Sequence, residues 1–362
     1  MSAHRLYDTW FKRIRELLPK ERVTRVRNVA WMIVGMYLSQ SVHLSYMARR
    51  LPFAAKLPSI TDRFRRLIDN AAFTVREWYR PIAEELLTEA ARCERVTLIL
   101  DGTKVGAGHQ LLMVALAYRK RALPIAWEWV KGARGHSKTN VQLKLLRAVH
   151  ALMPETARVL VVGDCEFGEI RVAQQLERWH WNYVLRLPGN TRVCVSRMSL
   201  TWRNLASLVS GRDQVAWHEH AVVTFMHLHH AHLLTLWATQ EKEPWLLMTN
   251  LPDARSALKA YRRRMWIEER FGDWKDHGVR LEKTHLRGAD HLSRLVFLVA
   301  LLYLWLITRG AQAIKAGERQ LVDRKDRRDL SVFRIGLYLT ERYCTQGRYP
   351  AIRFRPCFES VR

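Results

Sequence analysis

The sequence has few acidic residues and little glycine or proline, and these shortages exclude several classes of protein. Only 34 Asp and Glu accompany 60 Lys and Arg in 362 residues, so the formal net charge is +26, which argues against an ordinary neutral metabolic enzyme. With 17 Gly, 11 Pro and 48% apolar residues, the chain is not a disordered basic tail either. The charge therefore lies on a folded body, and the length predicts two or three domains.

Cysteine is scarce and scattered along the chain. No C-x-x-C pair occurs, which argues against a disulfide framework or a zinc site and is typical of reduced thiols in a cytosolic protein. The five residues are Cys93, Cys165, Cys194, Cys344 and Cys357.

Long apolar runs are missing as well. The longest, Leu295–Ile307, has 13 residues, whereas a helix needs about 20 to span a bilayer. It predicts a buried core helix. The first ten residues lack the apolar segment of a signal peptide, so we expect a cytoplasmic protein without a membrane partner.

The excess of positive charge predicts a polyanionic partner, and nucleic acid is the commonest one. A membrane surface is the rival, which the short apolar run disfavours. The 14 Trp residues could fill a core or stack on nucleobases, and composition does not separate these uses.

The first 95 residues have the three- and four-residue apolar spacing of helices and form a predicted DNA-binding domain. Residues 41–51 and 59–68 are predicted helices on either side of a Pro-containing turn, with Ser59 and Asp62 as a capping-box-like start. This arrangement fits a helix-turn-helix, and an ordinary helical hairpin with a solvated basic face fits equally well. The basic residues of the second helix are Arg63, Arg65 and Arg66.

From residue 96 the pattern changes to short strands rich in β-branched residues, with helices between the later ones. It predicts an α/β catalytic domain over residues 96–310, built on a mixed sheet that is antiparallel at first and then parallel. Residues 190–250 predict a β-rich insertion. Helices follow, one of them from about residue 254 to 275, and residues 311–362 form a C-terminal helical region.

Two aspartates follow predicted buried strands. Asp101 comes directly after VTLIL, and Asp164 comes after VLVVG. Open α/β sheets place functional groups at the carboxyl ends of strands, although Asp is also a common turn residue at such places.

Four residues of the predicted helix 254–275 share one narrow face. At 100° per residue, Tyr261, Arg264, Glu268 and Lys275 fall at about 0°, −60°, −20° and −40°. A salt-bridge ladder would explain Arg264 and Glu268, which are four residues apart, but it would not explain the other two.

The spacing Tyr-x2-Arg-x3-Glu-x6-Lys resembles the signature of one group of bacterial insertion-sequence transposases, and all four positions match. Asp101, Asp164 and the β-rich insertion before Glu268 also fit that family. The resemblance covers roughly residues 95–310. It implies an RNase H-like catalytic domain with a DDE triad and cut-and-paste transposition of DNA.

The resemblance implies that Asp101, Asp164 and Glu268 are both the catalytic residues and the metal ligands. Two Mg2+ ions, for which Mn2+ could substitute, suit such carboxylates. Tyr261, Arg264 and Lys275 would then bind DNA phosphates.

Trp245 lies shortly before the Glu268 helix, where related transposases carry a Trp that stacks on a base flipped out of the transposon end. It is therefore a predicted DNA-binding residue, and the alternative is a Trp packed in the core. Glu166 and Glu169 are weaker alternatives to Asp164 as ligands. A histidine-rich segment could hold zinc but lacks partners at ligand spacing; its members are His218, His220, His227, His229, His230 and His232.

The sequence therefore predicts a bacterial DNA transposase, an endonuclease that binds the terminal inverted repeats of its element, cuts DNA and joins the 3′ ends to target DNA through a hairpin intermediate. We expect a homodimer that holds two ends, and a cytoplasmic protein associated with the nucleoid. The alternatives are an inactive sequence-specific regulator, an RNase H-like nuclease that acts on DNA structure, and a polyanion-binding structural protein.

Overall fold

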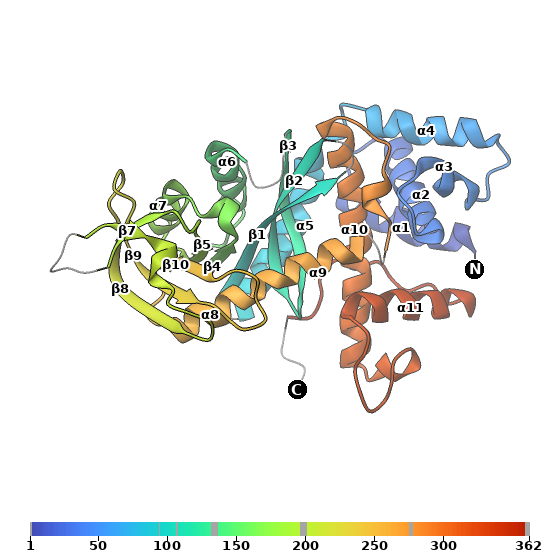
Figure 1. Cartoon of the computed structure of the whole chain (residues 1–362). Helices are drawn as coiled ribbons and strands as arrows, with labels where there is room; N and C mark the ends of the chain where they lie inside the picture. The colour runs from blue at the N-terminus through green and yellow to red at the C-terminus, as the bar shows by residue number, and fades with distance from the viewer. Residues whose placement is uncertain are drawn as a thin grey trace. The chain divides into compact units, whose positions relative to one another are not determined.

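The computed structural model describes residues 2–93, 95–105, 108–131, 137–195, 201–274 and 278–358. The chain divides into two compact units (Figure 1). Unit 1 comprises Met1–Cys93, Lys104–His109 and Arg270–Arg362, and unit 2 comprises Glu94–Thr103 and Gln110–Glu269. Helices from both ends of the chain thus share one unit, and the three-part division expected from the sequence stays a prediction.

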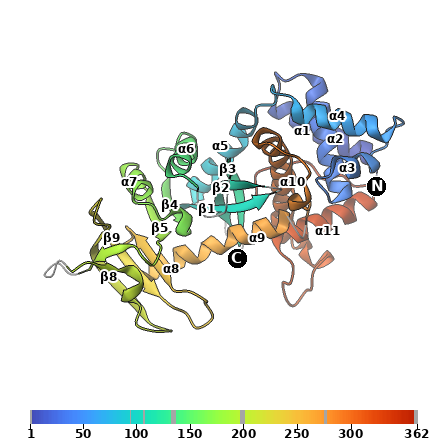
Figure 2. The same cartoon turned by 45° about the horizontal axis from the view of Figure 1, so that its top comes forward.

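Unit 2 is built on one sheet, which within the described residues has ten strands in the order β3-β2-β1-β4-β5-β10-β9-β8-β6-β7 (Figures 1 and 2). The β-rich insertion continues this sheet, because β10 pairs antiparallel with β5. The strands are β1 (Arg95–Val105), β2 (His109–Tyr118), β3 (Arg121–Lys131), β4 (Arg158–Gly163), β5 (Asn182–Arg186), β6 (Arg192–Cys194), β7 (Arg203–Asn204), β8 (Val215–Val223), β9 (His229–Leu236) and β10 (Trp245–Thr249).

The strand sequences explain the sheet. β1 pairs parallel with β4, and β4 pairs parallel with β5; such strands are covered on both faces, which is why they read as continuous apolar runs. β2 and β3 are joined by Arg119 and Lys120, both at positive φ (45° and 61°), as in the tight turns of antiparallel hairpins. The predicted fold class, an α/β protein with a mixed sheet, a β-rich insertion and helices at both ends, is confirmed.

Helices cover the sheet of unit 2. Helix α6 (Thr139–His150) packs on β3, α7 (Ile170–Arg178) packs on β5, and α8 (Ala254–Tyr261) packs on both β4 and β5. Asp253 caps α8 by accepting a hydrogen bond from the Ser256 N–H at 2.8 Å. These contacts fix α8 beside β4, the strand that Asp164 follows.

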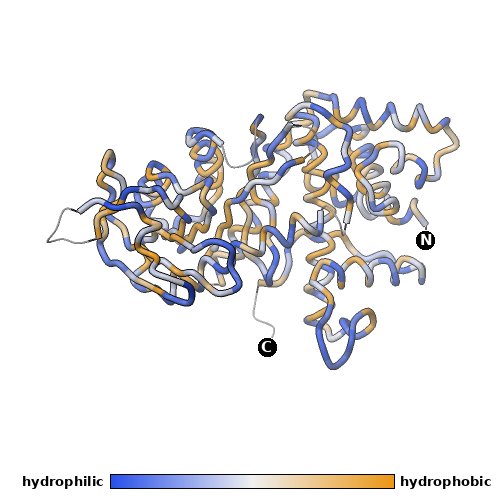
Figure 3. Tube along the Cα trace, in the orientation of Figure 1, coloured by the Kyte–Doolittle hydropathy of each residue, from blue (hydrophilic) through white to orange (hydrophobic). Residues whose placement is uncertain are grey.

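Unit 1 is helical, and α10 (Ala289–Lys315) is its central element. By length and composition alone, α10 could cross a membrane. However, 89% of its most apolar 18-residue window is buried inside the protein. It carries the hydrophobic colour over much of its length (Figure 3). The predicted core helix around Leu295–Ile307 is therefore confirmed. Helix α9 (Met265–Trp274) begins in unit 2 and ends in unit 1. The other helices of unit 1 are α1 (Ala3–Leu17), α2 (Val23–Ser39), α3 (Leu44–Arg49), α4 (Leu57–Asp69), α5 (Val75–Cys93) and α11 (Val332–Thr345). Helix α5 includes Pro81.

The predicted helix-turn-helix differs in its boundaries. Helix α3 has only six residues, and α4 begins at Leu57, two residues before the expected start at Ser59. Pro58 lies in the first turn of α4, where its fixed φ suits a helix and its missing N–H costs nothing. Ser59 thus lies inside the helix, and the capping box predicted there is wrong.

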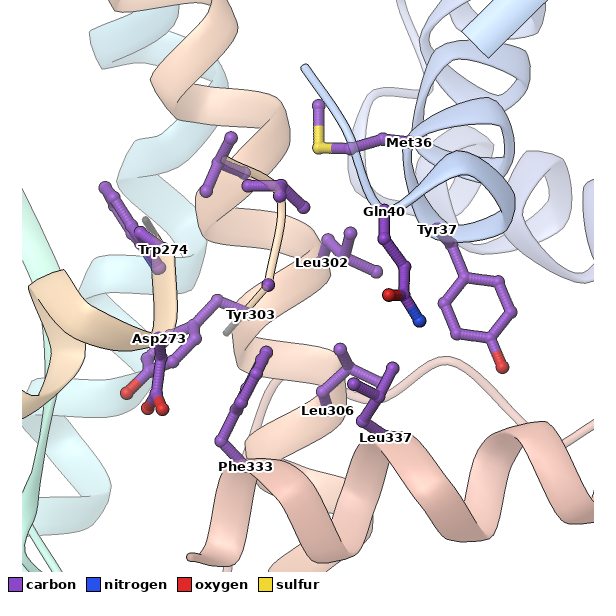
Figure 4. Close-up of a pocket in the computed structure, with 13 residues that line it drawn as sticks. Met36, Tyr37, Gln40, Asp273, Trp274, Leu302, Tyr303, Leu306, Phe333 and Leu337 are labelled. Atoms are coloured by element: carbon purple, nitrogen blue, oxygen red, sulfur yellow. The ribbon is translucent and has the colours of Figure 1, made fainter. Parts of the chain in front are cut away.

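A small cavity lies in unit 1 among α2, α10 and α11 (Figure 4). Its walls include Gln40, Leu302, Tyr303 and Phe333, and its free space is about 20 Å³, room for about one water molecule. It is too small for a substrate and is a feature of core packing.

The histidine-rich segment divides between the surface and the core of unit 2. His220 and His232 meet edge to face with ring centroids 4.9 Å apart, whereas His229 is 5% exposed. The Tyr183 hydroxyl donates to Glu177 at 2.9 Å and lies 3.0 Å from His229 Nε2. Since that hydroxyl proton is already used, His229 Nε2 is the donor to Tyr183.

Gly310→Ala should destabilise unit 1. Helices α10 and α11 cross so closely at Gly310 and Gly336 that a Cβ on Gly310 would clash with the Val332 carbonyl, and backbone cannot yield as a side chain can. We expect a loss of about 1–3 kcal/mol in the free energy of unfolding, measured in urea. Gly272→Ala is the matched control, because Gly272 lies in α9 with open space around its Cβ position. An equal effect of both changes would contradict this account of the crossing.

His229→Gln should weaken the loss of stability in mild acid. Burial lowers the pKa of His229 below its ordinary value of 6.5, while the Glu177 carboxylate opposes the shift. Below pH 6.5 the unfolded chain therefore binds the proton more readily, so this contribution to stability is present above that pH and is lost as pH falls. Unfolding midpoints from pH 7.5 to 5 should fall less in the variant than in the wild type. His227→Gln, at an exposed position, is the control.

Candidate active site

The pairing of β1 with β4 places the two predicted aspartates side by side. The last pair of the parallel register is Leu100 with Gly163, and Asp101 and Asp164 are the next residues of their strands. One expectation needs correction, since β1 does not end before Asp101 but continues to Val105. Its neighbour β2 keeps it extended beyond the end of β4.

Local backbone contacts fix both carboxylates. Asp101 is 1% exposed, and its Oδ1 accepts a hydrogen bond from the Gly102 N–H at 2.7 Å. Asp164 caps the short 3-10 helix η1 (Cys165–Phe167), and its Oδ1 accepts from the Glu166 N–H at 3.0 Å. The turn-forming role weighed for Asp164 is therefore real.

The predicted long helix 254–275 is interrupted. Between α8 and α9 lies the 3-10 turn η3 (Arg262–Arg264), which packs on β4 and is tied to β1 by a 2.9 Å hydrogen bond from Arg263 Nη1 to Thr97 Oγ1. A 3-10 turn has three residues per turn, so Tyr261 and Arg264 still share a face. The interruption therefore preserves the expected alignment.

Arg264 connects the acids of the site. Its Nη2 donates to Glu268 Oε1 at 2.7 Å, and its Nη1 lies 3.5 Å from Asp101 Oδ2. Burial lowers the pKa of Arg264, but the facing Tyr261 hydroxyl and the Asp101 and Glu268 carboxylates outweigh it and raise the pKa above its ordinary value. The guanidinium stays charged and holds two carboxylates from distant parts of the sequence.

Tyr261 and Trp245 lie together beside this group. Their rings meet edge to face with centroids 5.1 Å apart, and the Arg264 guanidinium carbon is 6.0 Å from the Tyr261 ring centroid. Burial raises the pKa of Tyr261 to about 12, with Arg264 and Arg186 opposing. Its hydroxyl is therefore a neutral hydrogen-bond donor at any physiological pH. Lys275 lies outside the described residues.

Sequence reasoning missed the polar residues that surround the acids. Gln110 is fully buried at the start of β2, and its Nε2 contacts both carboxylate oxygens of Glu166 at 3.0 and 2.8 Å. The Ser137 N–H donates to the same carboxylate at 2.9 Å. A Gln inside the apolar run HQLLMV was the only signal. Glu166, weighed as an alternative ligand, is thus held beside Gly102.

The carboxylates of this site are suitable ligands for a divalent ion, but their side chains do not converge on one point among the described residues. Carboxylate oxygens are the ligands that Mg2+ prefers, and Asp101 and Asp164 present them at neighbouring positions. Among the described residues, no group of three His, Cys, Asp or Glu side chains converges closely enough to hold a metal ion. Arg264 places a positive charge between Asp101 and Glu268.

Comparisons with known proteins identify the family. Residues 92–305 match the model of the transposase DDE domain. A cryo-EM structure of the piggyBac transposase synaptic complex with hairpin DNA is similar over 99% of this chain and 84% of that chain, with 10% identity and a TM-score of 0.41. No curated protein matches the sequence. Because the family model covers more than half of the chain, the protein belongs to the transposases with a DDE domain.

Proposed function

We propose that the protein binds the terminal inverted repeats of its own element, cleaves the DNA there and joins the 3′ ends to target DNA through a hairpin intermediate. The observation that carries the proposal is that Arg264 contacts both Asp101 and Glu268, while the β1–β4 register places Asp164 next to Asp101. Family membership supports transposition, and the complete Tyr-x2-Arg-x3-Glu-x6-Lys spacing supports a bacterial insertion-sequence origin.

The residues have separate roles in this mechanism. Asp101, Asp164 and Glu268 would hold the divalent ions. The chemistry supplied by two bound Mg2+ ions, for which Mn2+ can substitute, is activation of the attacking oxygen and stabilisation of the leaving oxygen. Arg264 and the Tyr261 hydroxyl donate hydrogen bonds to phosphate oxygens of the terminal strand, as would Lys275.

The N-terminal helices offer a surface for the rest of the DNA. A hollow between α2 and α4 is lined by guanidinium and amide groups, which contact both phosphates and base edges in protein–DNA complexes. Arg63 Nε donates to Asn28 Oδ1 at 2.6 Å, which orients both groups. The lining residues are Thr24, Arg25, Asn28, Arg63, Arg66, Leu67 and Asn70.

Transposition has consequences for the oligomeric state of the protein and for its place in the cell. Two ends must be cut and joined together, so we propose a homodimer that holds both in one synaptic complex. The net charge of +26 supports association with DNA of the bacterial nucleoid in the cytoplasm.

Replacing each acid with its amide should abolish cutting and leave binding intact. Asp101→Asn, Asp164→Asn and Glu268→Gln remove metal-binding charge with little change of shape. Loss of an outer-shell partner costs about 10–100-fold, so loss of a ligand should exceed about 100-fold. Nicking of a duplex taken from the flanks of the gene, with Mg2+, measures the rate, and a gel shift measures binding.

Glu269→Gln is the matched control for Glu268→Gln, because Glu269 is the adjacent residue, its side chain is exposed, and it pairs with Arg121 at 3.3 Å. Glu166→Gln tests whether Glu166 replaces Asp164 as a ligand. Retained cutting in Asp164→Asn, together with its loss in Glu166→Gln, would transfer the role. Binding without any nicking by the wild type would favour an inactive regulator.

Trp245→Ala should impair the hairpin step more than the first nick. Stacking on an extruded base contributes about 1–3 kcal/mol, so hairpin formation should slow by roughly 5- to 150-fold, while nicking requires no extruded base. Trp245→Phe keeps an aromatic face and should lose much less. Both steps are read from end-labelled strands on a denaturing gel, and an equal loss in both steps would indicate a structural role beside Tyr261.

A further inference from the structure

Arg264 differs from the other two arginines of its turn. Arg262 is exposed, and Arg263 bonds to Thr97. The Arg264 side chain is 13% exposed and has one carboxylate at each terminal nitrogen, Glu268 at 2.7 Å and Asp101 at 3.5 Å. Its charge is therefore withdrawn from solvent and directed at the acids of the proposed catalytic site.

The two acids come from separate elements, Asp101 from β1 and Glu268 from α9. Left alone, the buried Asp101 would face uncompensated loss of hydration. One planar guanidinium with two forked nitrogens can contact both carboxylates at once, which a single ammonium does less well. The Arg264 guanidinium thus balances the charge of these acids when no metal ion is bound.

We propose that Arg264 is an internal counter-ion, which holds Asp101 and Glu268 in the DNA-free protein and is displaced toward a DNA phosphate when divalent cations bind these acids. The proposal rests on the proposed function. A guanidinium and a divalent cation repel each other at such short range. Cation binding therefore becomes favourable only when Arg264 has another anion to contact.

This arrangement couples the two ligands. DNA draws Arg264 from the acids and so raises their affinity for cations, and by linkage cations raise the affinity for DNA. Without DNA, the site keeps a low affinity for the ions that it needs for cutting. Arg264 is then a positioning residue for the acids as well as a phosphate contact.

The first test measures Mn2+ binding by the full-length protein without DNA, from the electron paramagnetic resonance signal of free Mn2+. Arg264→Gln should tighten binding by about tenfold, equivalent to ~1.4 kcal/mol. Arg262→Gln removes the same charge from the same turn and should leave the affinity nearly unchanged. Equal or weaker Mn2+ binding by Arg264→Gln, relative to the wild type, would overturn the proposal.

A second variant covers the case in which Arg264→Gln fails to fold, as judged by circular dichroism. Arg264→Lys keeps the charge but loses the fork, so it should tighten Mn2+ binding by a smaller factor. A pre-cleaved terminal duplex, which has no bond left to cut, should then tighten Mn2+ binding by the wild type more than by either variant. Equal tightening in all three proteins would also overturn the coupling.

These outcomes separate the inference from the proposed function. If neither the wild type nor Arg264→Gln binds Mn2+, with or without the duplex, the metal-dependent function itself fails. If both bind Mn2+ with equal affinity, the function stands and the counter-ion role of Arg264 is rejected.

Discussion

The site depends on the parallel register of β1 with β4. Side chains of a strand alternate between the two faces of a sheet, so a slip by one residue would turn Asp101 or Asp164 to the opposite face. Apolar residues of both strands are buried along nearly their whole paired length, which holds β1 and β4 together inside the sheet. Burial of these strands thus places two acidic groups at neighbouring positions.

Electrostatics imposes the second constraint. The protein carries a net charge of +26 and nevertheless buries Asp101 in the interior of unit 2. Burial of an unpaired carboxylate is costly, and Arg264 offsets that cost. The surplus of basic residues favours a polyanionic partner, while Asp101, Asp164 and Glu268 are the metal ligands of the proposed mechanism. Attraction of the polyanion and the proposed metal-dependent cleavage therefore depend on different residues.

The insertion serves the site because it extends the same sheet. β10 pairs with β5 and β9 and begins at Trp245, which brings that ring against Tyr261. Strands separated by more than fifty residues in the sequence become neighbours only through tertiary pairing. Arg186, at the end of β5, contacts Glu243 and the Pro244 carbonyl and so fixes the approach to β10.

The sequence alone determined the class of the fold, the buried strands, the core helix and the acids with their helical partners, because apolar periodicity and residue spacing are local properties. It did not determine that η3 interrupts the helix at Arg262, that α4 begins at Leu57, or that Gln110 holds Glu166, since these depend on packing against distant elements. Nor could spacing show which carboxylates Arg264 contacts. Helical spacing makes Glu268 a neighbour of Arg264. Asp101 lies near Arg264 only in the folded sheet, because the partner of a buried charge depends on tertiary packing and not on sequence spacing.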